Sequence, residues 1–139
     1  MSKTSLLFHV VINTKYHKNT IPELSKRELY KYIFGILSNP GCKVLRINGI
    51  GNHLHILFCM PSTMTLASIM QSIKQSSSRW MLRNPLFPMF EGWGKEYFAI
   101  TVSPYDKEKV IEYIKNQEKH HLGKDFDEEM KELIEKSSL

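Results

Sequence analysis

Four segments of the chain have the residue pattern of β-strands. The first, SLLFHVVINT, is rich in β-branched and aromatic side chains, which predicts a buried strand. Apolar and polar residues alternate in CKVLRING, and a turn at IGN leads into HLHILFCM, so these two segments predict a hairpin. EYFAITVS predicts the last strand. Together the predicted strands cover residues 5–14, 42–49, 53–60 and 96–103.

Two segments between these strands have the spacing of amphipathic helices. In residues 24–39 the apolar side chains stand at positions 29, 32, 33, 36 and 37. Ser25 followed by Glu28 predicts a capping box at the start of this helix. Residues 65–82 repeat the pattern and predict a second helix that begins at Thr65.

A third helix is predicted after the last strand. Ser103 suits its N-cap, and Pro104 suits its first position because a proline has no N–H to satisfy there. The pattern runs to about His121, and Gly123 is expected to end the helix.

The predicted order is β-α-β-β-α-β followed by this third helix. The sequence therefore predicts an α+β fold of the ferredoxin-like kind, a four-stranded antiparallel sheet with two helices on one face. The additional C-terminal helix, which carries Tyr113, can cover the free face or pack against a partner chain. We expect one catalytic domain over residues 1–122, followed by an acidic tail over 123–139 that is helical or loose.

The net charge of +5 is unevenly distributed along the chain. The tail carries three lysines and six acids, whereas the rest of the chain is strongly basic. A basic body is typical of a protein that binds a polyanion, and it is also compatible with an ordinary solvated surface. Charge alone does not decide between these two interpretations.

The two cysteines and the apolar segments indicate the cellular compartment of the protein. Cys42 and Cys59 form neither a CxxC pair nor a zinc-type group, which fits the reducing cytoplasm. The N-terminal apolar run lacks the features of a signal peptide, and no segment approaches the roughly 18 apolar residues of a membrane span. We expect a cytoplasmic protein without a membrane partner.

His53 and His55 are the first candidates for chemistry. Side chains alternate along a strand, so both imidazoles lie on one face, with Cα atoms about 7 Å apart, while Leu54 points into the core. Such a pair can bind a metal ion, although most pairs of this kind are structural or surface histidines. Two nitrogens are also an incomplete site, so at least one further ligand is needed.

Tyr113 and Gln117 lie on one face of the third predicted helix because they are four residues apart. In a purely structural interpretation, Tyr113 is an aromatic residue of the core and Gln117 is a polar residue at its edge. Alternatively, a divalent cation near Tyr113 would favour its phenolate, which is scarce at neutral pH since the phenol pKa is about 10. Gln117 could offer its amide oxygen to that cation, and mixed nitrogen and oxygen ligands suit Mg²⁺ or Mn²⁺.

These motifs resemble a known family. NHLHILF resembles the histidine strand of the HUH endonucleases, and YIKNQEKHH resembles the tyrosine helix of their single-tyrosine transposases. These are small insertion-sequence enzymes that mobilise single-stranded DNA, and they include the REP-associated tyrosine transposases. The resemblance continues in FHVVINTKYHK, SIKQSSSRW and WGKEYFAITVSPYDKEKVIEYIKNQ, and it covers nearly all of residues 5–126.

The resemblance implies a function and a set of roles. Tyr113 would be the nucleophile that forms a 5′-phosphotyrosine link, and His53, His55 and Gln117 would bind the divalent metal. Many family members have Asp before the first histidine, where this chain has Asn52, so any role of that carboxylate is in question here.

The resemblance also implies partners. The expected substrate is single-stranded DNA with hairpins near the element ends. The expected assembly is a homodimer in which the tyrosine helix of one subunit can complete the histidine pair of the other. A prokaryotic cytoplasm is the expected setting.

Two alternatives remain open at this point. One is another HUH enzyme, either domesticated or of the replication-initiator or relaxase type, although the short chain argues against the latter two. The other is a non-catalytic ferredoxin-like nucleic-acid binder, which would not need the histidine pair, the tyrosine and the glutamine together.

Several basic and aromatic residues are candidates for contacts with DNA. The basic ones would bind phosphates, and an exposed aromatic ring could stack on an unpaired base. His9 is expected to be a satisfied histidine of the core or sheet face, and His17 a loop residue. His120 and His121 suit a helix C-terminus, where positive charge is favoured. The basic candidates are Lys15, Arg46, Lys74, Arg79, Arg83 and Lys95, and the aromatic ones are Trp80, Phe90, Trp93, Tyr97 and Phe98.

Overall fold

The four predicted strands form a single antiparallel sheet. The structure is a computed structural model that describes residues 3–117 and 125–137. The strand order is β2-β3-β1-β4, which is the ferredoxin-like order. The strands are β1 (Leu7–Thr14), β2 (Lys43–Ile50), β3 (His53–Cys59) and β4 (Trp93–Val102).

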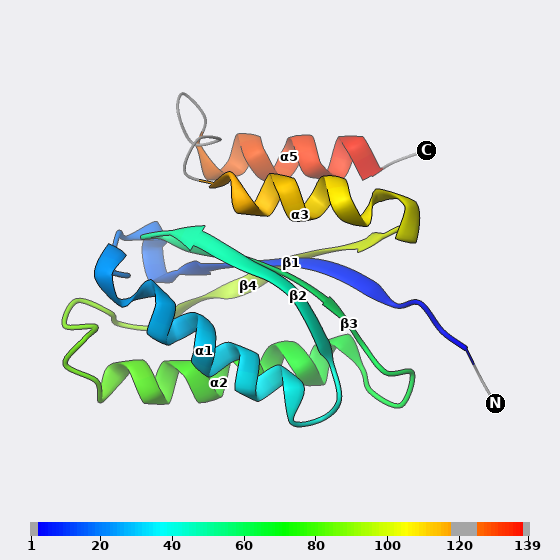
Figure 1. The fold of residues 1–139 in the computed structure, drawn as a ribbon. Helices are drawn as coiled ribbons and strands as arrows, with labels where there is room; N and C mark the ends of the chain where they lie inside the picture. The colour runs from blue at the N-terminus through cyan, green and yellow to red at the C-terminus, as the bar shows by residue number, and fades with distance from the viewer. Residues whose placement is uncertain (1–2, 118–124, 138–139) are drawn as a thin grey trace.

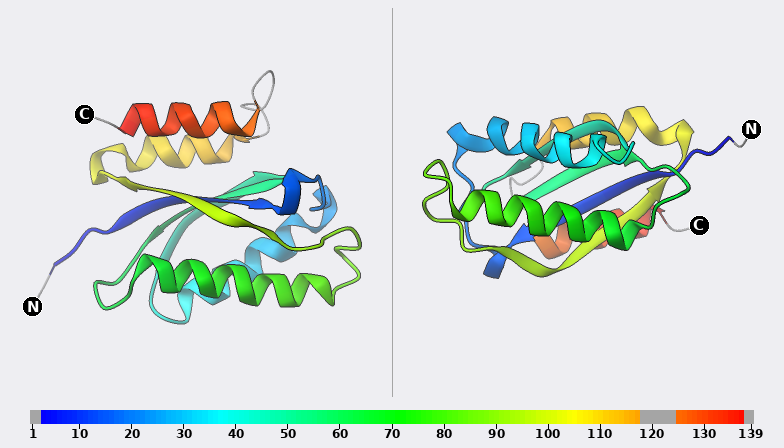
Figure 2. Two further views of the ribbon diagram at one scale, coloured as in Figure 1. Left: turned by 180° about the vertical axis from the view of Figure 1, so that it is seen from behind. Right: turned by 90° about the horizontal axis from the view of Figure 1, so that it is seen from below.

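Helices cover both faces of this sheet (Figure 1). Helices α1 (Lys26–Ser38) and α2 (Leu66–Leu82) lie side by side on one face. Helices α3 (Lys107–Lys115) and α5 (Phe126–Ser137) lie on the other, and the views from behind and below in Figure 2 show the same layers. The predicted α+β ferredoxin-like fold is confirmed, and the third predicted helix lies on the free face of its own sheet.

Strand alternation divides the interior into two parts. Even-numbered side chains such as Val10, Leu54 and Phe58 pack with the apolar faces of α1 and α2 in the larger core. On the other face, Leu57 and Ile114 belong to a smaller cluster beneath α3. The smaller cluster leaves room on that face for the polar side chains of β1 and β3.

The element ends differ from the predictions in three places. Helix α3 ends at Lys115 rather than at about His121, because Asn116 leaves the helical conformation. Thr65 caps α2 as predicted, accepting a hydrogen bond from the Ser68 amide at 3.1 Å. Ser25 makes no capping hydrogen bond, because a 3₁₀ turn (Glu23–Ser25) precedes α1 and the Ser25 hydroxyl donates to the carbonyl of Leu86 at 2.8 Å. Strand β4 begins at Trp93, three residues before the predicted strand, because its first residues continue the pairing with β1.

The C-terminal segment contains a helix that packs on the rest of the chain. In α5, Glu129 and Met130 are buried, at 3% and 8% exposure. Gly123, His120, His121 and the expected boundary at 122/123 lie outside the described residues. Among the described helices, none is long and apolar enough to cross a membrane.

Candidate active site

The turn between β2 and β3 fixes the start of the histidine strand. The carbonyl of Asn52 accepts a hydrogen bond from the Thr14 amide at 2.9 Å, and the carbonyl of Gly51 accepts from the amides of Thr20 and Ile21 at 3.0 Å. His53 therefore begins β3 beside the end of β1, opposite Asn13. The turn ties the site to the centre of the sheet.

His53 and His55 point toward α3 and α5, and both are buried, at 1% and 0% exposure. Their ring centroids are 5.2 Å apart. Leu54, between them, is fully buried in the core on the opposite face. The alternation predicted from the sequence therefore places both imidazoles on the same side of the sheet.

Helix α3 brings Tyr113 over this pair. The Tyr113 ring centroid is 5.7 Å from that of His55. The Asn48 side chain on β2 donates to the last carbonyls of the helix, those of Ile114 at 3.0 Å and Lys115 at 3.1 Å, which ties the helix end to the sheet. Gln117 follows the helix, is fully buried, and lies close enough to the Tyr113 hydroxyl to act against the rise in the Tyr113 pKa. The structure thus joins the tyrosine and glutamine to the histidine pair of the same chain.

Glu129 of α5 is a site residue that the sequence analysis missed. Its Oε1 accepts a hydrogen bond from the Tyr113 hydroxyl and lies 3.2 Å from His55 Nε2. Its Oε2 lies 3.5 Å from His53 Nε2. One carboxylate therefore contacts the tyrosine and both histidines.

Burial and hydrogen bonding shift the pKa values of this group in opposite directions. Burial raises the pKa of Tyr113 well above its usual range, and the hydrogen bond to the Glu129 carboxylate raises it further. Burial opposes ionisation of Glu129, but hydrogen bonds from His53, His55 and Tyr113 outweigh it and hold the Glu129 pKa well below its usual range. The resting site therefore pairs a neutral phenol with an ionised carboxylate.

Each histidine has a second partner at its Nδ1 atom. His53 Nδ1 is 2.7 Å from Asn52 Oδ1, so Asn52 provides this ring with a hydrogen-bond acceptor. His55 Nδ1 is 2.8 Å from Nε2 of the fully buried His9. Burial lowers the pKa of His9 to about 3, and the neighbouring His55 contributes to the shift, so His9 is neutral.

The three groups fit a divalent cation. One ligating atom each from His53, His55 and Glu129 lies within 4.8 Å of the others. Two donors that are each about 2.1 Å from one ion, at tetrahedral or octahedral angles, lie roughly 3.0–3.4 Å apart. The observed Nε2–carboxylate separations of 3.2 and 3.5 Å are close to this range. The predicted ligand Gln117 lies near these three residues, beside Tyr113.

Comparison with a family model decides the affiliation. The family model described as "Transposase IS200 like" matches residues 2–117, which include the histidine strand, Tyr113 and Gln117. This chain belongs to the IS200-like transposase family. None of the curated proteins matches the chain in sequence.

Solved structures agree with this IS200-like fold. A Deinococcus radiodurans R1 protein described as a transposase superposes with a TM-score of 0.65 at 20% identity, covering 84% of this chain and 93% of the other. A REP-associated tyrosine transposase bound to a REP hairpin superposes with a TM-score of 0.62 at 12% identity, covering 84% and 72%. At these identities the likeness concerns the fold.

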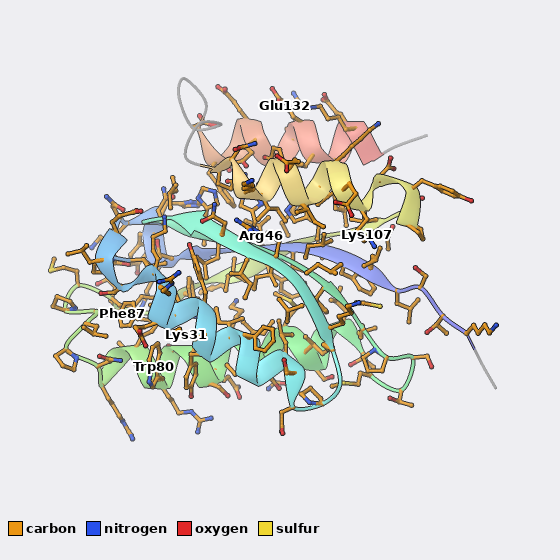
Figure 3. All side chains as sticks on the ribbon, in the orientation of Figure 1. Lys31, Arg46, Trp80, Phe87, Lys107 and Glu132 are labelled. Carbon is orange, nitrogen blue, oxygen red and sulfur yellow. The ribbon has the colours of Figure 1, made fainter. Side chains whose placement is uncertain are left out.

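The basic residues predicted to contact DNA do not form one patch on this IS200-like transposase. Arg46 lies on the side of β2 that faces α3, whereas Arg79 and Arg83 are exposed on and just after α2 on the opposite side. Lys74 donates to the carbonyl of Lys95, at 3.1 Å, where α2 meets β4. Figure 3 shows Arg46 and Trp80 on different layers of the molecule. Lys15 is exposed in the turn that follows β1.

Most of the aromatic candidates pack against other side chains of the protein. Phe90 and Trp93 are buried against each other, and the Trp93 indole donates to the Ser77 hydroxyl at 2.9 Å. Trp80 stacks on Tyr32 with centroids 4.4 Å apart. Tyr97 is 40% exposed and is the candidate of this group that keeps the most open ring.

Proposed function

We propose that this transposase cleaves and rejoins single-stranded DNA through a covalent link to Tyr113, with a divalent cation at the histidine pair. The observation that carries the proposal is the joint contact of Tyr113, His53 and His55 with a single carboxylate, that of Glu129. A nucleophile and metal-type ligands therefore converge on one point of the chain. Membership of the IS200-like family supports the proposal.

The proposed cleavage is a transfer of the phosphoryl group from DNA to tyrosine. The Tyr113 oxygen attacks the scissile phosphorus, the bond from phosphorus to the 3′ oxygen breaks, and the departing oxygen takes up a proton to give a 3′-hydroxyl. The phenol proton leaves Tyr113, and the DNA stays attached as a 5′-phosphotyrosine ester. Attack by a 3′-hydroxyl on this ester reverses the transfer, so rejoining needs no nucleotide cofactor.

The cation, Mg²⁺ or Mn²⁺, would polarise the phosphate and favour the phenolate when bound. His53 and His55 would hold it through Nε2, and Glu129 through its carboxylate. Gln117 can turn its amide oxygen to the same ion, as the resemblance implies. Because Glu129 also accepts the hydrogen bond of Tyr113, the carboxylate has to release the phenol before the tyrosine oxygen can reach a phosphate.

DNA hairpins are the proposed ligand. The similar REP-associated transposase was solved bound to a REP hairpin, which supports a folded single strand as the substrate class. The basic residues near β4 and α2 would bind phosphates and position the strand. Those residues are Lys15, Lys74, Arg79, Arg83 and Lys95, with Arg46 on the α3 side.

Two chains would be needed to process both ends of an element, so we propose a homodimer. The resemblance implies exchange of the tyrosine helix between subunits, whereas the geometry of a single chain supports assembly of each site within one chain. The two arrangements predict different results when variants are mixed.

Cleavage of labelled single-stranded DNA tests the function and the assembly together. With Mn²⁺, wild-type protein should cut DNA taken from the flanks of its gene, and His55→Ala should not. Mixing Tyr113→Phe with His53→Ala protein should restore no activity if each site is built within one chain. Recovered activity in the mixture would establish exchange between subunits, and full activity of His55→Ala would remove the metal role.

A further inference from the structure

The turn after β1 holds two residues in a backbone conformation that most side chains avoid. Tyr16 has φ 58° and ψ 22°, and His17 has φ 55°, so both lie in the left-handed region. Glycine and asparagine suit this region, whereas a bulky residue such as tyrosine is an outlier there. Outliers of this kind cluster at functional sites, so the presence of a tyrosine at position 16 points to a use of its side chain.

Hydrogen bonds on both sides hold this turn in place. The Lys15 amide donates to the carbonyl of Gly92 at 2.9 Å, which attaches the turn to the loop before β4. The Thr14 hydroxyl donates to the carbonyl of Lys18 at 2.6 Å, which closes the turn. The backbone of Tyr16 is therefore held by contacts of its neighbours rather than by its own side chain.

The Tyr16 ring is open to solvent and has positive charge beside it. Tyr16 is 73% exposed, and within the described residues the charged groups over its ring are the ammonium groups of Lys15 and Lys18, each 5.7 Å from the centroid. Lys18 also lies 3.2 Å from the Glu91 carboxylate, in an exposed ion pair of the kind that contributes little to stability. The turn therefore presents an accessible aromatic ring together with two lysines.

The same turn borders the candidate active site. The His17 ring centroid is 5.0 Å from that of Phe126 on α5, and Phe126 is in turn 5.0 Å from the His53 ring. The register agrees, because Asn13, three residues before Tyr16, pairs with His53 across the β1–β3 ladder. Three residues of chain span at most about 11 Å, so a nucleotide next to a phosphate at the histidine pair is within reach of Tyr16.

We propose that Tyr16 stacks on an unpaired base close to the scissile phosphate, while Lys15 and Lys18 contact phosphates of the same segment. Every base has a π-face, so this contact tolerates different sequences and selects for unpaired nucleotides. Lysine contacts to phosphate position the strand without reading its bases. The inference rests on the proposed function in one respect, that the ligand is single-stranded DNA. Within that function it assigns the unpaired flank, rather than the hairpin, to Tyr16.

Fluorescence anisotropy of labelled DNA in EDTA, where binding is followed without cleavage, tests this assignment. One probe is a palindrome from the flank of the gene with its unpaired neighbours, and the other is the same hairpin without those neighbours. Tyr16→Asn should weaken binding of the first probe about 5–100-fold, the range for loss of one base–aromatic stack, and leave the second unchanged. Tyr16→Trp should bind both as wild type does. Equal affinity of Tyr16→Asn and wild type for the first probe, or equal weakening for both probes, would overturn the proposal.

Thermal unfolding separates a stacking role from a structural one. Asparagine adopts the left-handed conformation more readily than tyrosine, so the Tm of Tyr16→Asn should equal or exceed that of wild type. A lower Tm would show that the ring supports the fold, which would overturn the proposal. The matched control is Tyr105→Asn, the same change at a 96% exposed tyrosine in the 3₁₀ turn Pro104–Asp106, which should leave DNA affinity unchanged.

The salt dependence of binding tests the two lysines. Lys15→Gln and Lys18→Gln should each reduce the slope of log affinity against log salt concentration by about 0.7, the value for one phosphate contact on a single strand. Tyr16→Asn should lower the affinity at an unchanged slope, because stacking releases no counterions. Unchanged slopes in both lysine variants would refute the phosphate contacts.

Failure of this inference and failure of the proposed function give different results. If wild type binds the first probe and Tyr16→Asn binds it equally well, only the Tyr16 role is wrong. If Tyr16→Asn shows the expected loss but wild type with Mn²⁺ forms no covalent adduct at Tyr113, the proposed chemistry is wrong and the stacking role stands. Failure of wild type to bind either probe would overturn both.

Discussion

Replacing Glu129 by glutamine tests the role of α5 most sharply. The amide has nearly the same shape as the carboxylate but no charge, and only one of its two terminal atoms can accept a hydrogen bond or bind a cation. In the structure both oxygens are used, Oε1 toward Tyr113 and His55 and Oε2 toward His53. The variant therefore has to give up contacts on one side, while the buried position at 3% exposure prevents water from replacing them.

The expected magnitude follows from linkage between cation binding and unfolding. At a cation concentration of 100 times Kd, binding stabilises the wild-type protein by about 2.7 kcal/mol. For a chain of this length that is about 8 °C in Tm, at roughly 3 °C per kcal/mol. Loss of a charged ligand should raise Kd at least about 100-fold, the upper end of what losing an outer partner costs. The same cation concentration would then stabilise the variant by only about 0.4 kcal/mol, or about 1 °C.

Thermal unfolding with and without Mn²⁺ measures this difference. The control is Glu128→Gln, which makes the same charge change at the neighbouring, exposed position of α5 and should keep the full Mn²⁺-induced shift. A shift in Glu129→Gln as large as in wild type would refute the reasoning, since the carboxylate would then not contact the ion.

Three further predictions concern stability. The Glu129 pKa is held low in the folded protein, so its ionised form stabilises the fold above the ordinary carboxyl pKa of about 4.3, and this stabilisation is lost as pH falls below that value. In urea unfolding between pH 6 and 3, the free energy of unfolding of wild type should therefore fall by up to about 1.4 kcal/mol per pH unit more than that of Glu129→Gln. Ser77→Ala leaves the buried indole N–H of Trp93 without its acceptor and should cost about 1–3 kcal/mol, seen as a lower urea midpoint at unchanged m. Gly49→Ala would place a Cβ against the carbonyl oxygen of His53, so it should lower the free energy of unfolding by about 1–3 kcal/mol and reduce the Mn²⁺-induced rise in Tm. An unchanged urea midpoint would contradict the close approach.

The fold and half of the site could be predicted because they depend on side chains that repeat every two residues in strands or every three to four residues in helices. A two-residue period placed His53 and His55 on one face and Leu54 on the other, and the structure confirms both placements. A four-residue period predicted Tyr113 and Gln117 on one face of the third helix; in the structure Tyr113 is on α3, and Gln117 lies two residues beyond its last residue, Lys115. The ferredoxin-like order then left one face of the sheet free for that helix.

Glu129 was missed because its role depends on tertiary packing; His9 is the buried, hydrogen-bonded histidine that was predicted, but its partner His55 could not be predicted. Glu129 is one of six acids in the tail, and only the docking of α5 distinguishes it from the others. A signal was present, since Glu129 lies three residues after Phe126 and next to Met130, on the apolar stripe of the helix. The link from His9 to His55 depends on the register of β1 against β3, which no local pattern encodes.

The DNA-binding residues were the least predictable part. Surface lysines and arginines have no period that marks them as a group, and the structure distributes Arg46 and Arg79 over opposite sides of the sheet. Their roles stay predictions. Similarly, Ser25 had the sequence of a helix cap, but its hydroxyl bonds to Leu86, sixty-one residues away.

Mapping the covalent adduct is the most direct test of Tyr113 as the nucleophile. Wild-type protein would be incubated with Mn²⁺ and single-stranded DNA that carries the palindromes flanking its gene, then denatured, digested and analysed by mass spectrometry. We expect a 5′-phosphotyrosine ester on the peptide that contains Tyr113, and no adduct in Tyr113→Phe. An adduct on another residue, or one that persists in Tyr113→Phe, would contradict it.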